Sequence, residues 1–225
     1  EQYGVDVKQV REIDNASSAV SAVLVDKNGE RLIVNRAVSG LDEDPSWLPL
    51  ERLTECSAVL VDSRWIPGAR ELLKKAKELG IPSILDADST PNEDISELVQ
   101  LATHIAFSKN GLMEVSGEKD PLEGLQKLSK SVEGWMCVTK GEEGTVWLEN
   151  GQSVQEPAFK TEVIDTLGAG DVFHGAFAYA IAHQMPLREA VQFSNATAAL
   201  KCRKLGGRAG IPSKKEVDAL LTLQG

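Results

Sequence analysis

The stretch VIDTLGAGDVFHGAFA, residues 163–178, decides the fold expected for this chain. Its first two residues, Val163 and Ile164, are apolar and predict the end of a strand, and a turn of small residues, Gly168-Ala169-Gly170, follows. After Asp171 the apolar residues recur at helical spacing: Val172, Phe173, Ala176, Phe177 and Ala180. Asp171 is therefore expected in the first turn of an amphipathic helix.

The turn that precedes Asp171 suits an anion. Glycines on both sides of Ala169 let the backbone N–H groups turn inward without Cβ clashes, and a helix N-terminus adds partial positive charge. A carboxylate beside a bound phosphate can take the proton of an attacking hydroxyl, as phosphoryl transfer requires. The alternative is structural, because an Asp in the first turn of a helix also stabilises the helix start. The next glycine is Gly175 and no Gly-Lys-Ser/Thr follows, which excludes a dinucleotide fingerprint and a P-loop.

Composition narrows the class of protein. The 225 residues, 42% of them hydrophobic, can bury one substantial core. The formal net charge of −10 argues against nucleic acid or an anionic membrane as a partner, since both select for excess Lys and Arg. With no apolar run of membrane-spanning length and no signal peptide, a cytoplasmic protein is expected. Cys56, Cys137 and Cys202 show no C-x-x-C spacing and are expected to be reduced core thiols, and the histidines form no metal motif.

Two patterns of secondary structure follow one another along the chain. Residues 19–25 and 31–38 are β-rich runs joined by Asn28-Gly29, which predicts an antiparallel ribbon. From Ala58 the chain alternates strand and helix, which predicts an α/β fold with a doubly wound, mostly parallel sheet flanked by helices. The predicted strands are 58–62, 83–88, 104–108 and 135–141, then a strand near 163; the predicted helices are 67–80, 95–102, 112–116, 122–131, 187–204 and 214–223.

Ligands of such sheets bind outside the carboxyl ends of the strands. The residues that follow the predicted strands suit phosphate, ribose and sugar hydroxyls: Ser63, Arg64, Trp65, Asp86, Asp88, Ser108, Lys109, Asn110, Thr139, Lys140 and Gly141. Each of them alone is more often a cap or a solvated loop residue than a ligand contact.

The string DTLGAGD, residues 165–171, resembles the D-T-x-G-A-G-D signature of the PfkB (ribokinase-like) sugar kinases. The similarity covers essentially the whole chain through the segments GVDV, DKNGER, VTKGEEG, SNATAALKC and GGRAGIP. It implies a single kinase domain over residues 1–225 that uses ATP and Mg²⁺ to phosphorylate a primary hydroxyl of a sugar. The family normally begins with a strand, a sugar-binding Asp and a Gly-Gly…Asn segment ahead of the first residue here. N-terminal strand and helix elements are therefore expected to be missing, and a non-catalytic nucleotide-binding relative is an alternative.

The resemblance also implies roles for single residues. Asp171 is the catalytic base and contacts the sugar hydroxyl, and the amides of Gly168, Ala169 and Gly170 form the anion hole. Asp165, with the loop near Gly207, resembles a monovalent-cation site that would take K⁺. The ribbon of about residues 17–38 looks like a lid that closes over the sugar and pairs subunits into a homodimer. The residues matching the family's nucleotide-binding segments are Thr139, Gly141, Gly144, Asn195, Ala198 and Gly207.

Within the family the sequence looks closest to the sulfofructose kinases, with ketohexokinases next. The segments that carry this likeness are residues 63–65, 86–91, 94–98 and 206–212. At a strand end, the forked guanidinium of Arg64 could grip a sulfonate, and Asn35 on the lid could add a donor, so 6-deoxy-6-sulfofructose is one predicted acceptor. A neutral sugar, with Arg64 in a rim salt bridge, is the alternative. Many members carry Asn-x-x-Glu to organise Mg²⁺-bound water, and here Ser108 and Gly111 stand in those places.

Overall fold

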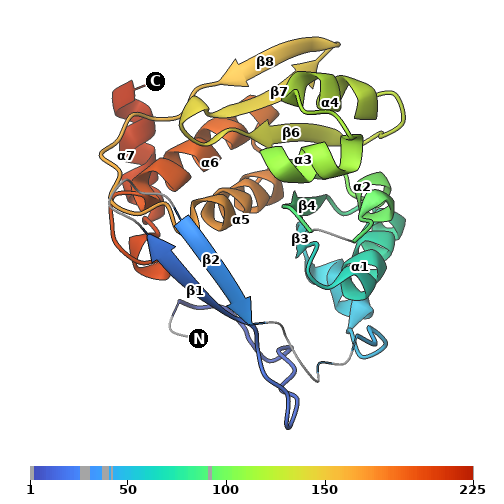
Figure 1. The fold of residues 1–225 in the computed structure, drawn as a ribbon. Coiled ribbons are helices and arrows are strands. Elements are labelled where there is room, and N and C mark those ends of the chain that lie inside the picture. Colours follow the sequence, from blue (N-terminus) through green and yellow to red (C-terminus); the bar gives the residue numbers. More distant parts are fainter. Residues whose placement is uncertain (1–2, 26–30, 37–40, 42, 91–92, 225) are drawn as a thin grey trace. The chain divides into compact units, whose positions relative to one another are not determined.

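The computed structural model of the chain describes residues 3–25, 31–36, 41, 43–90 and 93–224, which form two compact units, 1–44 and 45–225. The first unit contains the ribbon of β1 (Val20–Val25) and β2 (Arg31–Arg36) (Figure 1). The strands are antiparallel, with Val20 opposite Arg36 and Val25 opposite Arg31. The predicted ribbon is confirmed in these residues, while its Asn28-Gly29 turn and Val38 lie outside the described part of the chain.

The second unit is built on one sheet whose strands lie in the order β3-β4-β5-β6-β7-β8 (Figure 1). Neighbours from β3 to β6 run parallel, and the β6–β7 and β7–β8 pairs are antiparallel. The predicted mostly parallel sheet is thus confirmed. The strands are β3 (Val59–Asp62), β4 (Ser83–Ala87), β5 (His104–Ser108), β6 (Trp135–Thr139), β7 (Thr145–Glu149) and β8 (Gln152–Glu156).

Helices cover both faces of the sheet, and each face has its own apolar core. Adjacent residues of β4 serve both cores, since Leu85 packs on one face and Ile84 on the other, so this strand is apolar without alternation. One face carries α1 (Ile66–Leu79), α2 (Ser96–Leu101), α3 (Lys109–Ser116) and α4 (Pro121–Leu128); the other carries α5 (Ala169–Ala182), α6 (Leu187–Lys201) and α7 (Lys214–Gln224). Short 3-10 helices are η1 (Leu50–Glu55), η2 (Gly141–Glu143) and η3 (Arg208–Gly210).

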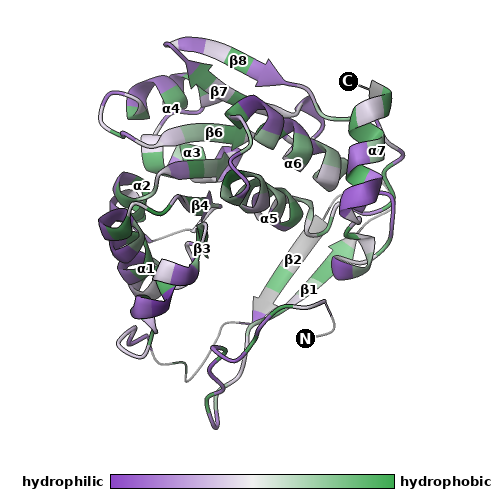
Figure 2. Ribbon diagram, turned by 180° about the vertical axis from the view of Figure 1, so that it is seen from behind, coloured by the Kyte–Doolittle hydropathy of each residue, from purple (hydrophilic) through white to green (hydrophobic). Residues whose placement is uncertain are grey.

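Hydrophobic residues predominate on α5, which contacts β3 and β4, and hydrophilic residues predominate on α1 (Figure 2). Most of the apolar residues predicted to lie on one side of α5 are buried in the core between the sheet and α5, α6 and α7. They are Phe173, Ala176, Phe177 and Ala180. No helix within the described ranges is long and apolar enough to cross a membrane.

The structure corrects the bounds of several predicted elements, including α4, which ends at Leu128 rather than Ser131, and it adds one hairpin. Val163 and Ile164 are not in a strand; both are exposed, and Ile164 donates its N–H to the carbonyl of Cys202 at 2.8 Å. Helix α3 begins at Lys109 rather than Leu112, because the Ser108 hydroxyl caps it by accepting the Gly111 N–H at 3.0 Å. Helix α6 ends at Lys201 rather than Lys204. The β7–β8 hairpin was not predicted.

The hairpin had a sequence signal. Its turn is Asn150-Gly151, with φ of 51° and 78°, the left-handed pair that a two-residue turn requires. The signal is the one that identified the ribbon at Asn28-Gly29.

The expectation of core thiols is confirmed for two of the cysteines and wrong for the third. Cys137 and Cys202 are buried, whereas Cys56 is exposed at the end of η1. Burial raises the pKa of the Cys137 thiol, so little of the reactive thiolate forms there at neutral pH.

Thiol labelling of the native protein should therefore discriminate among the cysteines. With iodoacetamide at pH 8 we expect Cys56 to react and Cys137 and Cys202 to stay unmodified, as measured by peptide mass spectrometry. In denaturant all three should be labelled. Native labelling of Cys137 at the rate of Cys56 would contradict the described packing.

Candidate active site

The carboxyl ends of β3 to β6 meet at one edge of the sheet, as the parallel register requires. Asp62 is paired with Asp86, and Ser108 with Thr139. The polar residues predicted after these strands therefore share this edge, called here the carboxyl edge.

The start of α5 contains the predicted glycine turn and helix, and within that turn the Ala169 N–H donates to the Thr166 carbonyl at 3.1 Å. Gly168 is the N-cap residue in the left-handed conformation, with φ 75°, which favours glycine. Asp171 lies in the first turn and is exposed. A Cβ placed on Gly170 would meet no atom within 4 Å, so the backbone is open to close approach there.

His174 fixes α5 against the carboxyl edge, one helical turn after Asp171. Its Nδ1 lies 3.0 Å from Oδ2 of Asp86, the next-to-last residue of β4. Its Nε2 lies 3.3 Å from the carbonyl oxygen of Ala106 in β5. Both side chains are largely buried, at 7% and 17% exposure. The sequence analysis missed this pair, because nothing local distinguishes His174 from the apolar residues around it.

The segment before α5 is joined to the loop after α6. Oδ1 of Asp165 accepts the Leu167 N–H and Oδ2 accepts the Gly206 N–H, both at 2.8 Å. A Cβ on Gly168 would lie 3.7 Å from the Cα of Gly207. The structure thus brings Asp165 and Gly207, which the sequence had assigned to one cation site, close to Gly168 of the predicted anion hole.

The nucleotide-binding candidates at the end of β6 surround η2. Thr139 donates its hydroxyl to the carbonyl of Phe107 at 3.2 Å, tying β6 to β5. Gly141 has φ 61° and open space around it, and Gly144 has φ 91°. A Cβ on Gly144 would overlap the carbonyl oxygen of Glu156, so the fold itself requires a glycine there.

Asn195 holds α6 to the β7–β8 hairpin. It is buried, its Oδ1 accepts from the Thr145 hydroxyl at 2.8 Å, and its Nδ2 donates to the carbonyls of Glu156 and Pro157 at 3.3 and 3.4 Å. Ala198 is half-buried one turn further along α6. The geometry thus gives Asn195 a structural role, and its predicted contact with adenine stays a prediction.

Two lysines converge on Glu143 at the carboxyl edge. The ammonium of Lys109 lies 2.8 Å from one carboxylate oxygen and that of Lys140 lies 2.6 Å from the other. The hydrogen bond from Lys109 has the largest effect and that from Lys140 the next, and together they lower the pKa of Glu143 from 4.5 to about 2. The cluster joins α3 to η2 and carries one more positive than negative charge.

A lowered pKa in the folded state makes stability depend on pH. The ordinary pKa of a glutamate is 4.5, and above this pH the ionised Glu143 carboxylate adds to the free energy of unfolding. This added stability is lost as the pH falls toward 2. We expect the Glu143→Gln variant to unfold at lower urea than the wild type at pH 6, with the gap closing below pH 4.5. The control is Glu142→Gln, whose carboxylate makes no ion pair within the described residues; a constant gap at all pH values would contradict the argument.

Arg64 adopts the rim salt bridge that the sequence left open. Its guanidinium lies 3.8 Å from the Asp88 carboxylate, and both side chains are more than half exposed. The backbone N–H of Arg64 donates to Oδ1 of Asp62 at 2.8 Å, and this hydrogen bond orients the turn after β3. Asn35 lies in β2 opposite Ser21, and its side chain is outside the described part.

Gly111 stands where the resemblance would often place a Glu that organises Mg²⁺-bound water. The surrounding backbone leaves no space for a side chain at this position. A Cβ there would overlap the carbonyl oxygen of Ala87. Glu114, one turn later, instead accepts from the Ser89 hydroxyl at 2.5 Å and the Thr90 N–H at 3.0 Å. Among the described residues, no three His, Cys, Asp or Glu side chains are grouped to hold a metal ion.

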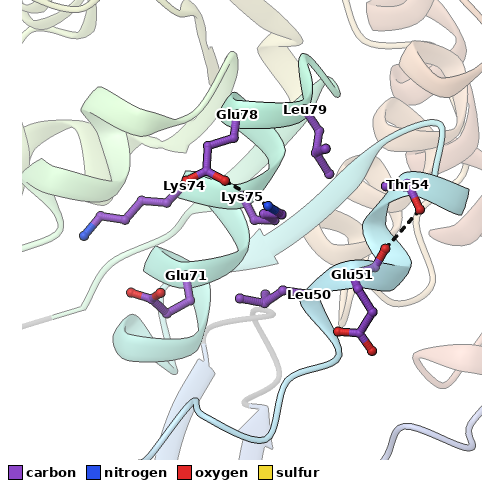
Figure 3. Close-up of a pocket in the computed structure, with 8 residues that line it drawn as sticks. All are labelled: Leu50, Glu51, Thr54, Glu71, Lys74, Lys75, Glu78 and Leu79. Carbon is purple, nitrogen blue, oxygen red and sulfur yellow. Dashed lines mark hydrogen bonds and ion pairs between the residues drawn. The ribbon is translucent and has the colours of Figure 1, made fainter.

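Figure 3 shows a groove of about 560 Å³ between η1 and α1, lined by Leu50, Glu51, Thr54, Glu71, Lys74, Lys75, Glu78 and Leu79. Its α1 residues run from Glu71 to Leu79, the part of the helix that leads toward β4. Because α1 leads from the carboxyl end of β3 back toward the start of β4, this part of the helix is distant from the carboxyl edge. The groove is thus separate from the site described above.

The comparison with known families decides the identity of this arrangement. The model described as "pfkB family carbohydrate kinase" matches residues 1–214. The chain belongs to the pfkB family. The members of this family are phosphotransferases with an alcohol group as acceptor, so the resemblance read from DTLGAGD is confirmed.

Similar proteins agree with this family. The ribokinase of Schizosaccharomyces pombe is 26% identical over 235 residues, covering 98% of this chain and 73% of that protein. A solved structure of a proposed ribokinase of Agrobacterium tumefaciens is 37% identical with a TM-score of 0.86, covering 93% of this chain and 70% of that one. Arabidopsis thaliana ribokinase, solved with ribose and ATP, has a TM-score of 0.83 at 24% identity, covering 97% and 73%.

The comparisons thus confirm the ribokinase-like fold and the family. The further likeness to sulfofructose kinases stays a prediction, as do the individual roles assigned to the site residues.

Proposed function

We propose that this pfkB chain is an ATP-dependent sugar kinase that transfers the γ-phosphoryl group to a primary hydroxyl. The observation that carries the proposal is the start of α5 at the carboxyl edge. There a left-handed Gly168 opens the helix, an exposed Asp171 lies in its first turn, and His174, one turn later, lies against Asp86 of β4 and Ala106 of β5.

In the proposed reaction Asp171 accepts the proton of the sugar hydroxyl as its oxygen attacks the γ-phosphorus. The bond from that phosphorus to the bridging oxygen breaks, and ADP leaves. The N–H groups of Gly168 and Gly170 would stabilise the charge on the transferred group, helped by the helix dipole. The N–H of Ala169 donates to the Thr166 carbonyl at 3.1 Å and would have to exchange that partner for the phosphoryl oxygen.

For ATP we propose the segment after β6, with Thr139, Gly141 and Gly144, together with Ala198 of α6 and Gly207 in the loop that follows α6. The Lys109 and Lys140 ammonium groups add positive charge near this edge. Mg²⁺ in such sites keeps several waters and is held by substrate phosphates with one or two carboxylates. At this edge Asp88 offers a carboxylate that is more than half exposed and pairs with Arg64, whereas Asp86 is largely buried against His174. Asp88 could thus hold Mg²⁺ together with the phosphates, and the ion would neutralise phosphate charge.

For the acceptor, a neutral sugar of the ribokinase or ketohexokinase type is supported by the relatives named ribokinase. An anionic ketose such as 6-deoxy-6-sulfofructose is the second candidate, and Arg64 supports it. Its side chain is 64% exposed at the carboxyl edge, and at 3.8 Å its ion pair with Asp88 is long enough for a sulfonate to displace.

We further propose that the β1–β2 ribbon is the lid of a single kinase domain and the surface that pairs two subunits. Val20, Ala22 and Leu24 alternate along β1 on one face, and Ala22 is paired with the exposed Val34 in β2. An apolar face on an isolated two-stranded ribbon calls for a cover. Light scattering of the chain, with and without a Val34→Lys substitution, tests the pairing.

Release of ADP from ATP and Mg²⁺ tests the proposed reaction, with ribose, fructose, fructose 6-phosphate and 6-deoxy-6-sulfofructose as acceptors. Turnover of any acceptor supports the kinase. A preference for the sulfonate that the Arg64→Met variant loses, while Arg70→Met on α1 keeps it, supports the anionic acceptor. ATP binding by calorimetry without ADP release from any sugar would instead support the non-catalytic nucleotide-binding alternative.

A further inference from the structure

Lys201 is a buried cation beside the proposed anion hole. It is the last residue of α6, and its side chain is 0% exposed. Burying a lysine is costly unless its charge is compensated. Here the ammonium donates to the carbonyl oxygen of Asp165 at 2.8 Å and lies 3.9 Å from Oδ2 of the same residue. The cation is therefore held by both the backbone and the carboxylate of Asp165.

The same lysine connects three segments of the site. Asp165 leads through Leu167 into the Gly168 turn, and its carboxylate receives the N–H groups of Leu167 and Gly206. On the far side, a Cβ on Gly210 would lie 2.7 Å from the carbonyl oxygen of Lys201 and 3.4 Å from its Cε. The loop after α6 thus packs on the aliphatic part of the Lys201 side chain. The ammonium of the same side chain binds the segment before α5.

The Lys201 ammonium thus occupies the site at Asp165 where the resemblance implied a monovalent cation. The K⁺ ligands that the resemblance implied are the Asp165 carboxylate and the loop near Gly207. Each carboxylate oxygen of Asp165 already accepts a backbone N–H, and the buried Lys201 ammonium lies 3.9 Å from Oδ2 and donates to the carbonyl of the same residue. A second cation near this ammonium would be repelled by it. The residues therefore do not fit the K⁺ site that the sequence resemblance implied.

We infer that the Lys201 ammonium is an internal substitute for that cation, and that it positions the 165–170 turn so that the reaction needs no K⁺. Lys201 touches neither the sugar nor the phosphate, and it acts through Asp165. The inference rests on the proposed kinase function for its activity readout, and it also has a readout that does not depend on catalysis.

The first test replaces the cation of the buffer. At equal ionic strength, we expect ADP release by the wild type to agree within about twofold in KCl, NaCl and choline chloride. Activation by K⁺ of tenfold or more would overturn the inference, since it would require a cation site that the ammonium does not fill.

The second test removes the ammonium. Lys201→Ala leaves a space and an uncompensated Asp165, so the turn loses its position, and we expect kcat to fall about 10²-fold with a smaller change in KM. Addition of NH₄⁺ or K⁺ should restore part of the rate. Lys201→Met fills the same space without charge and should be equally slow but not restored, and Lys204→Met, on an exposed neighbouring lysine, should behave as wild type.

Melting temperatures give the readout that is independent of activity. NH₄⁺ or K⁺ should raise the melting temperature of Lys201→Ala relative to choline and leave that of the wild type and Lys201→Met unchanged. If the wild type releases no ADP, the proposed function fails while this comparison still decides the inference. If Lys201→Ala melts and reacts without any response to cations, Lys201 is only a structural lysine and the inference is wrong.

Discussion

Asp171→Asn is expected to lower kcat for ADP release by about 10²- to 10⁴-fold, the range over which general bases contribute. Asparagine preserves the shape of the side chain and removes its ability to take the proton of the sugar hydroxyl. KM for ATP should change little, because the proposed nucleotide surface lies at β6 and after α6. Steady-state kinetics with the best acceptor of the panel measures both quantities.

A matched control separates catalysis from helix stabilisation. Glu123 lies in the first turn of α4, in the same position relative to its N-cap Asp120 as Asp171 has relative to Gly168. Both carboxylates interact with a helix dipole, an effect of about 0.3–1 kcal/mol on the free energy of unfolding. Glu123→Gln and Asp171→Asn should therefore shift stability alike, whereas only the second should reduce kcat. Equal rates in both variants would leave Asp171 with a structural role alone.

Gly144→Ala is expected to lower the free energy of unfolding by about 3 kcal/mol or more, because two penalties add. Gly144 has φ 91° and ψ −143°, a conformation that residues with a Cβ rarely adopt. The added methyl would also overlap the carbonyl of Glu156 and crowd the backbone of Pro157 and Ala158. These are main-chain atoms next to β8, so relief requires the hairpin to shift. Urea unfolding followed by circular dichroism measures the loss.

The control for this variant is Gly151→Ala in the turn between β7 and β8. Gly151 also has a positive φ, 78°, but a Cβ there would meet nothing within 4 Å. It carries only the conformational penalty, about 1–2 kcal/mol. A Gly144→Ala variant as stable as Gly151→Ala would show that the Glu156 carbonyl moves away freely, against the packing described here.

The sequence by itself determined the features that depend on neighbours along the chain. The Gly168 turn and the helix behind Asp171 were predictable, since left-handed φ, the helix dipole and apolar spacing all act within a few residues. The parallel sheet followed from the alternation of strand and helix. The Asn150-Gly151 hairpin was predictable by the same rule as the ribbon, although it was not recognised.

The tertiary structure alone decided which polar residues meet. Asn195 lies 50 residues from Thr145, and Lys201 lies 36 residues from Asp165. Helical spacing predicts which side of α6 is buried. It cannot predict that Lys201 on that side lies next to Asp165, a residue from a distant segment. Val163 and Ile164 show the converse, because apolar side chains predicted a strand where the chain had already left the sheet. Local preferences are set by a few residues, whereas burial and pairing of charge depend on contacts that form only when distant segments pack together.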